Sequence, residues 1–393
     1  RAKLQTTLNM DHLKMVPSKE GTSVLYNYSQ NKIFFLEKDI TDLIKEKGLS
    51  DPSTLNILGS SARINENIGC DGLERKLFCE IVDNCNLKCN HCYGSFCPSS
   101  TDRNSLTKEQ WKEVLTYFNE QEFGVVQFTG GEPLLRKDEL VELVESAYGL
   151  DFKGIEIFSN CTLFEEELMG DLERFQDKLK IRCSIYSTEE EIHDSITNYP
   201  GSYTQTLNNL IKLKEKGFDL ETITILMEEN KETLKEIQEL MKSLDISHSY
   251  DLVKPIGRGK QNYSVIEDLK KNYSTLRDDE DGSIVVRKPD AELSEKYNSC
   301  FYKTASITSS GDLYPCIFSR DILLGNVIKD GLSTTNEALL ENAERFAHKN
   351  IEGCGDCELR YACNDCRPLV HSLTDDWFSK SPLCPKETGM INV

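Results

Sequence analysis

The middle of the chain alternates short apolar runs with longer segments in which apolar residues recur at helical spacing. The expected strands are Leu77–Val82, Val125–Phe128, Gly154–Phe158, Lys180–Tyr186, Thr222–Leu226 and Tyr250–Val253. Helices are expected after them, from Thr107, where Gln110 completes a capping-box signature, and near 138–147, 164–175, 203–216 and 231–244. Strands joined by helical crossovers form a parallel sheet, so the pattern predicts an α/β fold with a partial (β/α)6 TIM-type barrel.

The regions on either side of this barrel have a different pattern. An alternation over Val24–Leu36 predicts a β-hairpin, and a short helix is expected at Asp39–Ile44, which together indicate a small N-terminal α+β unit. From Cys300 onward the chain is poor in apolar residues and dense in cysteine. We therefore expect three domains, covering residues 1–70, 71–290 and 291–393, the last of them Cys-rich.

Composition narrows the classes of function. The chain has 393 residues, and 46 Lys and Arg against 66 Asp and Glu give it a net charge of -20, which disfavours non-specific binding to nucleic acid or to an anionic membrane. No apolar run is long enough to span a bilayer and no signal-peptide pattern is present, so we expect a cytoplasmic protein. In a reducing compartment, 15 cysteines indicate metal ligation rather than disulfides.

The first group of cysteines is Cys85, Cys89 and Cys92, in a loop that directly follows the first barrel strand. Three thiolates at this spacing can hold three irons of a [4Fe-4S] cube and leave the fourth iron without a protein ligand. Three cysteines also suit a zinc site, which is the alternative for such a group in isolation. The second barrel strand runs into Gly130-Gly131-Glu132-Pro133, a second loop at the same end of the predicted sheet.

The two loops together resemble the radical S-adenosylmethionine (SAM) superfamily. The resemblance implies that Cys85, Cys89 and Cys92 ligate a [4Fe-4S] cluster, that SAM binds the open iron, and that one electron cleaves SAM to a 5′-deoxyadenosyl radical. It implies that Gly130, Gly131 and Glu132 receive the methionine part of SAM. Asn160 and Ser184 match the positions that contact its ribose and carboxylate, and His91 is either near the adenine or an ordinary surface histidine. The cysteine loop, the Gly130-Gly131-Glu132 loop and Asn160 fall at carboxyl ends of the expected strands, where barrels build their sites.

The second group of cysteines has the spacing C-x15-C, C-x2-C-x5-C-x2-C and C-x17-C, and it resembles the SPASM extension of radical SAM enzymes. The alternative is a pair of zinc ribbons. The resemblance implies a distal [4Fe-4S] cluster on Cys354, Cys357, Cys363 and Cys384. A proximal cluster would be held by Cys300, Cys316 and Cys366, which makes three clusters in all. The family's usual third interval is C-x3-C, whereas Cys363 and Cys366 are separated by two residues.

The proximal set lacks a cysteine that some members have. That cysteine lies just upstream of the position of Cys300, but here the nearest upstream cysteine is Cys183. An open iron there could bind a substrate thiolate, as proposed for members that join a cysteine sulfur to carbon. The resemblance is thus to sactipeptide and ranthipeptide thioether synthases among the RiPP (ribosomally made and modified peptide) maturases. The alternatives are carbon–carbon crosslinking, epimerisation, and formylglycine formation as in anaerobic sulfatase maturation.

The partners implied are a ribosomal precursor peptide, with a leader and a Cys-containing core, and an electron donor such as flavodoxin or ferredoxin. The N-terminal unit is either a leader-recognition domain or a structural cap on the barrel. Among the other residues, His193 and Asp194 are either catalytic or have capping and packing roles, and Cys97 or Cys161 could donate a hydrogen atom, as in peptide epimerases. The remaining cysteines are Cys70, Cys79 and Cys183, and strand positions suit Cys79 and Cys183 as small apolar residues.

Overall fold

The chain folds into two compact units in this computed structural model. The structure describes residues 13–18, 21–27, 32–54, 74–101, 105–263, 277–278, 284–285, 291–361, 363, 365–384 and 386. The barrel unit comprises Glu74–Leu269 and Phe301–Asn342, and the terminal unit comprises Arg1–Leu73, Lys270–Cys300 and Ala343–Val393. Residues 291–393 thus contribute to both units, and the three-domain division stays a prediction. Among the described residues, no helix combines the length and the apolar character that a membrane span needs.

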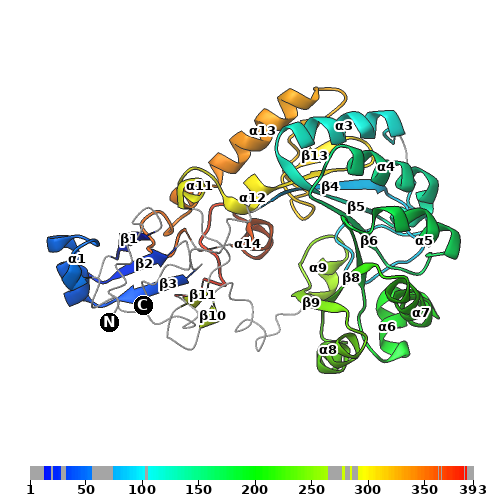
Figure 1. The fold of residues 1–393 in the computed structure, drawn as a ribbon, viewed down its shortest axis with the longest axis horizontal. Coiled ribbons are helices and arrows are strands. Elements are labelled where there is room, and N and C mark those ends of the chain that lie inside the picture. Colours follow the sequence, from blue (N-terminus) through cyan, green and yellow to red (C-terminus); the bar gives the residue numbers. More distant parts are fainter. Residues whose placement is uncertain are drawn as a thin grey trace, which may run out of the picture. The chain divides into compact units, whose positions relative to one another are not determined.

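The barrel unit is built on a nine-stranded, mainly parallel sheet (Figure 1). Its six predicted strands are confirmed and pair in parallel in chain order: β4(Arg75–Val82), β5(Phe123–Gly130), β6(Gly154–Ser159), β7(Leu179–Ser184), β8(Asp219–Leu226) and β9(Ser247–Leu252). The sequence did not predict the other three: β12(Thr304–Ile307), β13(Asp312–Tyr314) and β14(Gly325–Asn326). β12 runs parallel to β4, and β13 and β14 follow as an antiparallel extension.

Helices connect the parallel strands and lie outside the curved sheet (Figure 1). They are α3(Lys108–Glu120), η3(Pro133–Arg136), α4(Lys137–Gly149), α5(Glu166–Leu172), η4(Glu173–Phe175), α6(Glu190–Thr197), α7(Ser202–Glu215), η5(Lys231–Thr233), α8(Leu234–Ser243) and α9(Gly259–Asn262). The predicted capping box at α3 is confirmed, because Thr107 Oγ1 accepts from the Gln110 amide and Gln110 Oε1 accepts from the Thr107 amide. The helix α6 was not among the helices expected from the sequence. The helices α12(Ser299–Lys303) and α13(Leu332–Arg345) belong to the segment around β12–β14.

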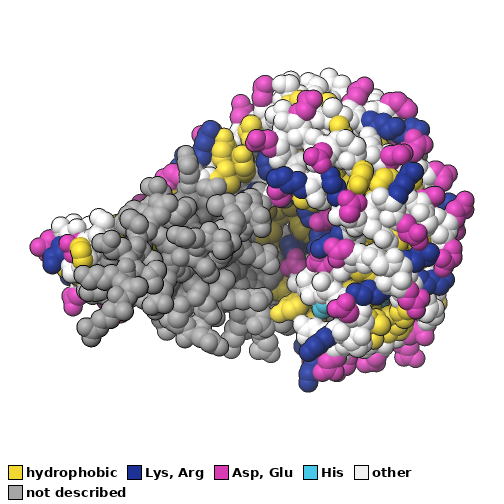
Figure 2. Space-filling view, in the orientation of Figure 1, with side chains coloured by type: hydrophobic (Ala, Val, Ile, Leu, Met, Phe, Trp, Pro, Cys, Tyr) yellow, Lys and Arg dark blue, Asp and Glu magenta, His cyan; other side chains and the backbone are white. Residues whose placement is uncertain are grey.

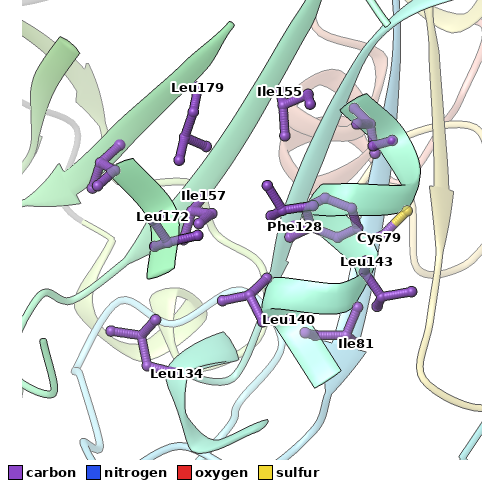
Figure 3. Packing of buried hydrophobic residues seen from close by; sticks show 14 of the residues in the cluster. Cys79, Ile81, Phe128, Leu134, Leu140, Leu143, Ile155, Ile157, Leu172 and Leu179 are labelled. Atoms are coloured by element: carbon purple, nitrogen blue, oxygen red, sulfur yellow. The ribbon is translucent and has the colours of Figure 1, made fainter. Parts of the chain in front are cut away.

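The two faces of this sheet differ in chemistry. Because strand side chains alternate, Cys79 and Ile81 of β4 and Phe128 of β5 point toward the helices, where they pack with Leu140 and Leu143 of α4 (Figure 3). Cys79 and Cys183 are completely buried in this core, which agrees with their predicted apolar role.

The opposite face of the sheet is charged. Arg182 on β7 forms ion pairs with Glu156 on β6 at 3.3 Å and with Glu221 on β8 at 3.0 Å, and Lys76 on β4 reaches Glu156 at 2.8 Å. These side chains are partly exposed. This face of the sheet is therefore polar and partly accessible. Its charged side chains lie on the same strands whose carboxyl ends lead into the loops of the site.

The terminal unit contains the predicted hairpin within a five-stranded antiparallel sheet of order β1-β2-β3-β11-β10. Its strands are β1(Leu13–Pro17), β2(Ser23–Asn27), β3(Lys32–Leu36), β10(Arg277–Asp278) and β11(Ile284–Val285), and its helices are α1(Lys38–Lys47), α11(Ala291–Lys296), η6(His348–Asn350) and α14(Arg367–Thr374). The Tyr26 hydroxyl donates to the Glu358 carbonyl, and the Tyr26 and Tyr361 rings are 5.7 Å apart. The hairpin thus packs against the segment that carries the last cysteines.

Candidate active site

The first cysteine group lies in the loop that follows β4, at the carboxyl edge of the parallel sheet. Burial raises the pKa of Cys89 to about 12, with a further contribution from the neighbouring Cys92. Burial also raises the pKa of Cys85, and Glu132, Cys89 and Cys92 add to this rise. The three thiols therefore lie close enough together to feel one another's charge, as the ligands of one cluster must.

Residues that follow β9 hold this loop. Arg258 Nε donates to the Cys89 carbonyl at 2.8 Å, and its terminal nitrogen donates to the Phe96 carbonyl at 2.6 Å. Asn262 Nδ2 donates to the Asn90 carbonyl at 2.7 Å. The loop takes its shape from a segment more than 160 residues away in the chain.

The end of α6 holds the other side of the loop. The amides of Lys88 and Asn90 donate to the carbonyls of Thr197 and Ile196 at 3.0 and 2.9 Å. Asn198, in the left-handed conformation with φ 54°, donates from Nδ2 to the Lys88 carbonyl at 2.9 Å. Hydrogen bonds to the loop's backbone on two sides therefore fix the path of the chain between the predicted ligands.

Gly130 and Gly131 place the second loop directly against the first. A Cβ on Gly130 would lie 2.3 Å from the Val82 carbonyl oxygen, and one on Gly131 would lie 2.0 Å from the Asn84 carbonyl oxygen. Gly130 also has φ 136°, a conformation that favours glycine. We expected these glycines to admit the methionine of SAM. Close backbone packing between the ends of β4 and β5 already requires both of them, and their contact with SAM stays a prediction.

Glu132 is completely buried and accepts three hydrogen bonds from its own chain. Its Oε1 accepts from Leu134 N at 3.0 Å and Ser159 Oγ at 2.8 Å, and its Oε2 accepts from Asn160 N at 2.8 Å. Burial raises the pKa of Glu132 to about 7, and the three bonds oppose that rise. Glu132 thus joins the loops after β5 and β6, and Oε2 keeps capacity for one further donor, such as the predicted ammonium.

Asn160 belongs to a polar triangle with Asn86 and Thr162. Its Nδ2 donates to Asn86 Oδ1 at 2.9 Å, its Oδ1 accepts from Thr162, and Asn86 donates back to Thr162 Oγ1 at 2.8 Å. The triangle ties the loop after β6 to the residue that follows Cys85.

Ser184 and His91 lie at the same end of the sheet. Ser184 is the last residue of β7. The His91 ring is 4.8 Å from the Tyr186 ring, and its buried Nε2 has no hydrogen-bond partner among the described residues. Burial, with help from Arg258, lowers the pKa of His91 to about 4, so the ring is neutral and its unpaired nitrogen suits a polar ligand.

A buried carboxylate that sequence reasoning missed connects the cysteine loop with β12–β14 and the loops around them. Glu80 on β4 is completely buried, accepts from the Tyr93 hydroxyl at 3.0 Å and pairs with Arg320. Tyr93 also packs against Phe318 at 5.5 Å between ring centres. In the sequence, Cys92 directly precedes Tyr93, and Cys316 lies two residues before Phe318. One set of buried contacts therefore adjoins a cysteine of each group. The sequence signal for these contacts is Glu80, an acidic residue inside the apolar run of β4.

The cysteines near the carboxyl terminus form a second cluster of thiols. Burial raises the pKa of Cys354 to about 11, with contributions from Cys357 and Cys384, and raises that of Cys363 to about 12, with contributions from the same neighbours. The four thiols predicted to hold the distal cluster therefore lie near enough to act on one another's charge, and their shared ligation of one cluster stays a prediction. Cys300 and Cys366 belong to the terminal unit and Cys316 to the barrel unit, and their shared ligation stays a prediction.

Both thiol sets fit [4Fe-4S] clusters in donor chemistry. Thiolate sulfurs are the ligands that such clusters use, and each binds a different iron. Among the described residues, no three cysteine, histidine or carboxylate side chains converge as the ligands of a single ion would. The high thiol pKa values mean that cluster binding must release protons from these residues.

Other candidate residues have structural roles. Asp194 accepts from Ser202 Oγ at 2.8 Å and from Tyr203 N at 2.9 Å, which caps the start of α7. His193 is buried, and its Nδ1 accepts from the Tyr186 amide at 3.2 Å. The predicted alternative of capping and packing therefore describes both residues.

The remaining cysteines differ in exposure. Cys161 is completely buried beside Cys183, whereas Cys97 is partly exposed and its sulfur lies 3.2 Å from Ser99 Oγ. The hydrogen-bonding serines lower the pKa of Cys97 to about 7. Cys70 lies outside the described residues.

Comparisons with known proteins agree with this geometry. A model of the radical SAM superfamily matches residues 79–241, and a model of the iron–sulfur cluster-binding SPASM domain matches residues 300–358. AlbA of Bacillus subtilis, an antilisterial bacteriocin subtilosin biosynthesis protein, is 24% identical over 303 residues, which cover 72% of this chain and 66% of AlbA, just under two thirds. An AdoMet-dependent heme synthase of Oleidesulfovibrio alaskensis is 24% identical over 344 residues, covering 78% of this chain and 85% of the synthase.

A solved structure shares the fold. Streptococcus suis SuiB, bound to the precursor peptide SuiA, superposes with a TM-score of 0.61 at 14% identity, covering 95% of this chain and 98% of SuiB. The two matched domains, together with a cysteine loop after β4 and a glycine loop packed on it after β5, place the chain in the radical SAM superfamily, as an enzyme with a SPASM iron–sulfur domain.

Proposed function

We propose that this enzyme is a peptide maturase that joins a cysteine sulfur of a ribosomally made precursor peptide to a carbon of the same peptide. The observation that carries the proposal is the ligand count. The distal set has four cysteines, Cys354, Cys357, Cys363 and Cys384, which would be enough to close one cluster, whereas the proximal set has three. An open coordination position suits a thiolate from the substrate. The similarity to AlbA supports a peptide substrate.

The reaction must remove two hydrogens from the peptide. When bound and reduced, the first cluster with SAM supplies a carbon-centred radical that takes one hydrogen atom from the acceptor carbon. The thiol loses its hydrogen as a proton and, as the carbon–sulfur bond forms, one electron leaves the peptide. Iron–sulfur clusters of the SPASM domain are one-electron acceptors of the required class.

The residues of this chain would orient the reactants. The hydrogen bonds from Arg258, Asn262 and α6 hold the loop that would carry the first cluster. The bonds of Glu132 and Asn160 hold the loops that would surround SAM. The charged sheet face of Lys76, Glu156 and Arg182 lies below these strand ends and would contact the polar main chain of a peptide.

The test uses enzyme reconstituted without oxygen, SAM, a reductant and a Cys-containing precursor peptide. The expected product is two hydrogens lighter, and its thiol no longer reacts with an alkylating reagent. The Cys85→Ala enzyme and a peptide with Ala in place of Cys serve as controls. A product of unchanged mass with a free thiol would contradict the proposal.

Other outcomes identify the alternatives. Loss of two hydrogens with the thiol still free would indicate a carbon–carbon crosslink, deuterium uptake from solvent at a backbone carbon would indicate epimerisation, and a new aldehyde would indicate formylglycine formation. The similarity to the AdoMet-dependent heme synthase favours a second candidate, modification of a porphyrin. Turnover of a porphyrin in place of every peptide tested would support that candidate.

A further inference from the structure

One buried cation lies in the segment that carries the last cysteines. Arg367 follows Cys366 directly and begins α14, and only 1% of its surface is exposed. Among the described residues it is the only lysine or arginine that is buried. On the face of the barrel unit seen in Figure 2, by contrast, basic side chains lie at the surface among acidic ones. A buried guanidinium must be compensated within the fold, because burying a charge without partners costs free energy.

Most of that compensation comes from three groups around Arg367. Its Nη1 donates to the carbonyls of Trp377 and Ser379 at 3.0 and 2.9 Å, and its Nη2 pairs with the Asp365 carboxylate. Its Nε is buried and has no hydrogen-bond partner among the described residues. Buried donors are rarely left unpaired, so this N–H group suits an acceptor other than the side chains and carbonyls that surround it.

Electrostatics place the guanidinium beside two thiols of the predicted distal set. Burial raises the pKa of Cys354 and Cys363, and the positive charge of Arg367 opposes that rise at both. In return, both thiols oppose the fall that burial causes in the pKa of Arg367. The Phe378 carbonyl, between the two that Arg367 holds, accepts from the Glu352 amide at 3.0 Å. The contacts of Arg367 are therefore joined to the chain two residues before Cys354.

We propose that Arg367 donates a hydrogen bond from Nε to a sulfur of the distal [4Fe-4S] cluster and thereby raises the reduction potential of that cluster. Cluster sulfurs accept hydrogen bonds, and a nearby cation and an N–H donor both stabilise the reduced, more negative state. The Asp365 carboxylate lies at a terminal nitrogen of Arg367, so it does not occupy Nε. A higher potential would make the distal cluster the better acceptor for the electron that leaves the peptide. The inference rests on the predicted distal ligation and not on the thioether product.

The first test measures reduction potentials without SAM or peptide. It uses the full chain with Cys85, Cys89 and Cys92 changed to Ala, so that the predicted ligands that remain are those of the two auxiliary clusters. The protein is reconstituted with iron and sulfide without oxygen. Electron paramagnetic resonance then follows each cluster as it takes up one electron during titration with dithionite. The potential that is missing when Cys363→Ala is added is assigned to the distal cluster.

Arg367→Met is compared in this background with Arg345→Met, the matched control, because Arg345 is an exposed arginine of the same unit. We expect Arg367→Met to lower the ratio of reduced to oxidised distal cluster about tenfold at a fixed applied potential, which is about 59 mV for one electron. The proximal potential should change less, and the control should leave both potentials unchanged. An unchanged distal potential in a variant that keeps its iron, an equal shift in the control, or zinc in place of a cluster at these thiols would overturn the inference.

A second measurement leaves Arg367 in place, so it does not depend on a variant that binds its cluster. Protein in the same background is made with arginine labelled with ¹⁵N at Nε alone, and pulsed electron paramagnetic resonance of the reduced distal cluster detects labelled nitrogen close to a sulfur. We expect a ¹⁵N coupling that Arg367→Lys abolishes. No coupling to the Nε label, or one that persists in Arg367→Lys, would contradict the proposed bond. Because neither SAM nor peptide is present, a wrong thioether assignment leaves both results readable.

Discussion

The two groups of cysteines are positioned in different ways. The loop of Cys85, Cys89 and Cys92 is held by Arg258, by Asn262 and by α6, all more than 100 residues away in sequence. The cysteines from 354 onward lie in successive turns whose backbone bonds are local, such as Cys357 N to the Cys354 carbonyl and Cys384 N to the Ser381 carbonyl, both at 3.0 Å.

Longer-range support for the second group comes from Tyr26, whose hydroxyl donates to the Glu358 carbonyl, and from the buried Arg367. Arg367 donates to the carbonyls of Trp377 and Ser379 at 3.0 and 2.9 Å. The fold therefore shapes the first site before any cluster is bound, whereas the second site depends more on its cluster for its shape. The predictions below test the two sites and how the fold holds the first, from the largest expected effect to the smallest.

Iron content gives the largest expected effect. Wild-type protein reconstituted without oxygen should bind about 12 iron atoms per chain, and the Cys85→Ala/Cys89→Ala/Cys92→Ala variant about 8, because one four-iron cluster is lost. SAM cleavage should disappear in that variant. Iron and sulfide analysis measure the effect, and zinc in place of most of the iron would contradict the cluster assignment at the second group.

Removal of the clusters should expose the second site far more than the first. We expect amide hydrogen exchange in 351–384 to rise by orders of magnitude after chelation, because local turns alone open easily. Exchange in 85–92 should rise much less, because long-range hydrogen bonds remain. Mass spectrometry of proteolytic fragments measures both segments in one sample, and equal deprotection would remove the distinction between the sites.

Loss of the Arg258 side chain should weaken the first site. Arg258→Met leaves the Cys89 and Phe96 carbonyls without their charged donor, and we expect a loss of about 2–4 kcal/mol in the free energy of unfolding. Denaturation of the cluster-free protein measures it, and iron retention by the first cluster should fall as well. Arg174→Met is the matched control, because Arg174 makes an exposed pair with Glu145 and should change stability by less than about 1 kcal/mol.

Gly131→Ala tests the contact between the two loops of the first site. The new methyl group would overlap the Asn84 carbonyl, and we expect a cost of about 1–3 kcal/mol together with weaker SAM binding. In Gly149→Ala, at the end of α4, the methyl group meets no atom within 4 Å, so stability should stay the same or rise by about 0.5–1 kcal/mol. Thermal unfolding and equilibrium dialysis with SAM separate the two variants.

Glu132 should leave a smaller signature in the pH dependence of stability. Burial raises its pKa from 4.5 to about 7, so the folded chain binds a proton that the unfolded chain releases. The contribution of Glu132 to stability is therefore largest below pH 4.5, and it declines as the pH rises through about 7. Denaturation of the cluster-free wild type and Glu132→Gln between pH 5 and 8 should show a shallower decline in the variant; identical slopes would contradict the buried, protonated state.

The sequence by itself determined what depends on local pattern. Short apolar runs predicted β4–β9, and an apolar–polar alternation predicted the β2–β3 hairpin, because both patterns depend only on residues that are close in sequence. The cysteine spacing and the Gly130-Gly131-Glu132 loop identified the superfamily, and the spacing also predicts the distal ligands Cys354, Cys357, Cys363 and Cys384. Each of these features can be predicted without knowing which distant residues pack against it.

Only the tertiary structure decided how that site is held. Arg258 lies in a segment with no periodic signal, and its role depends on the Cys89 and Phe96 carbonyls. Glu132 has a carboxylate that would suit an ammonium, yet the fold surrounds it with donors from Leu134, Ser159 and Asn160. Glu80 and Arg320 are 240 residues apart, and β12 lies beside β4 although 222 residues separate the ends of the two strands. Such contacts come from chain folding over long separations, and neither periodicity nor spacing encodes which distant residues will meet.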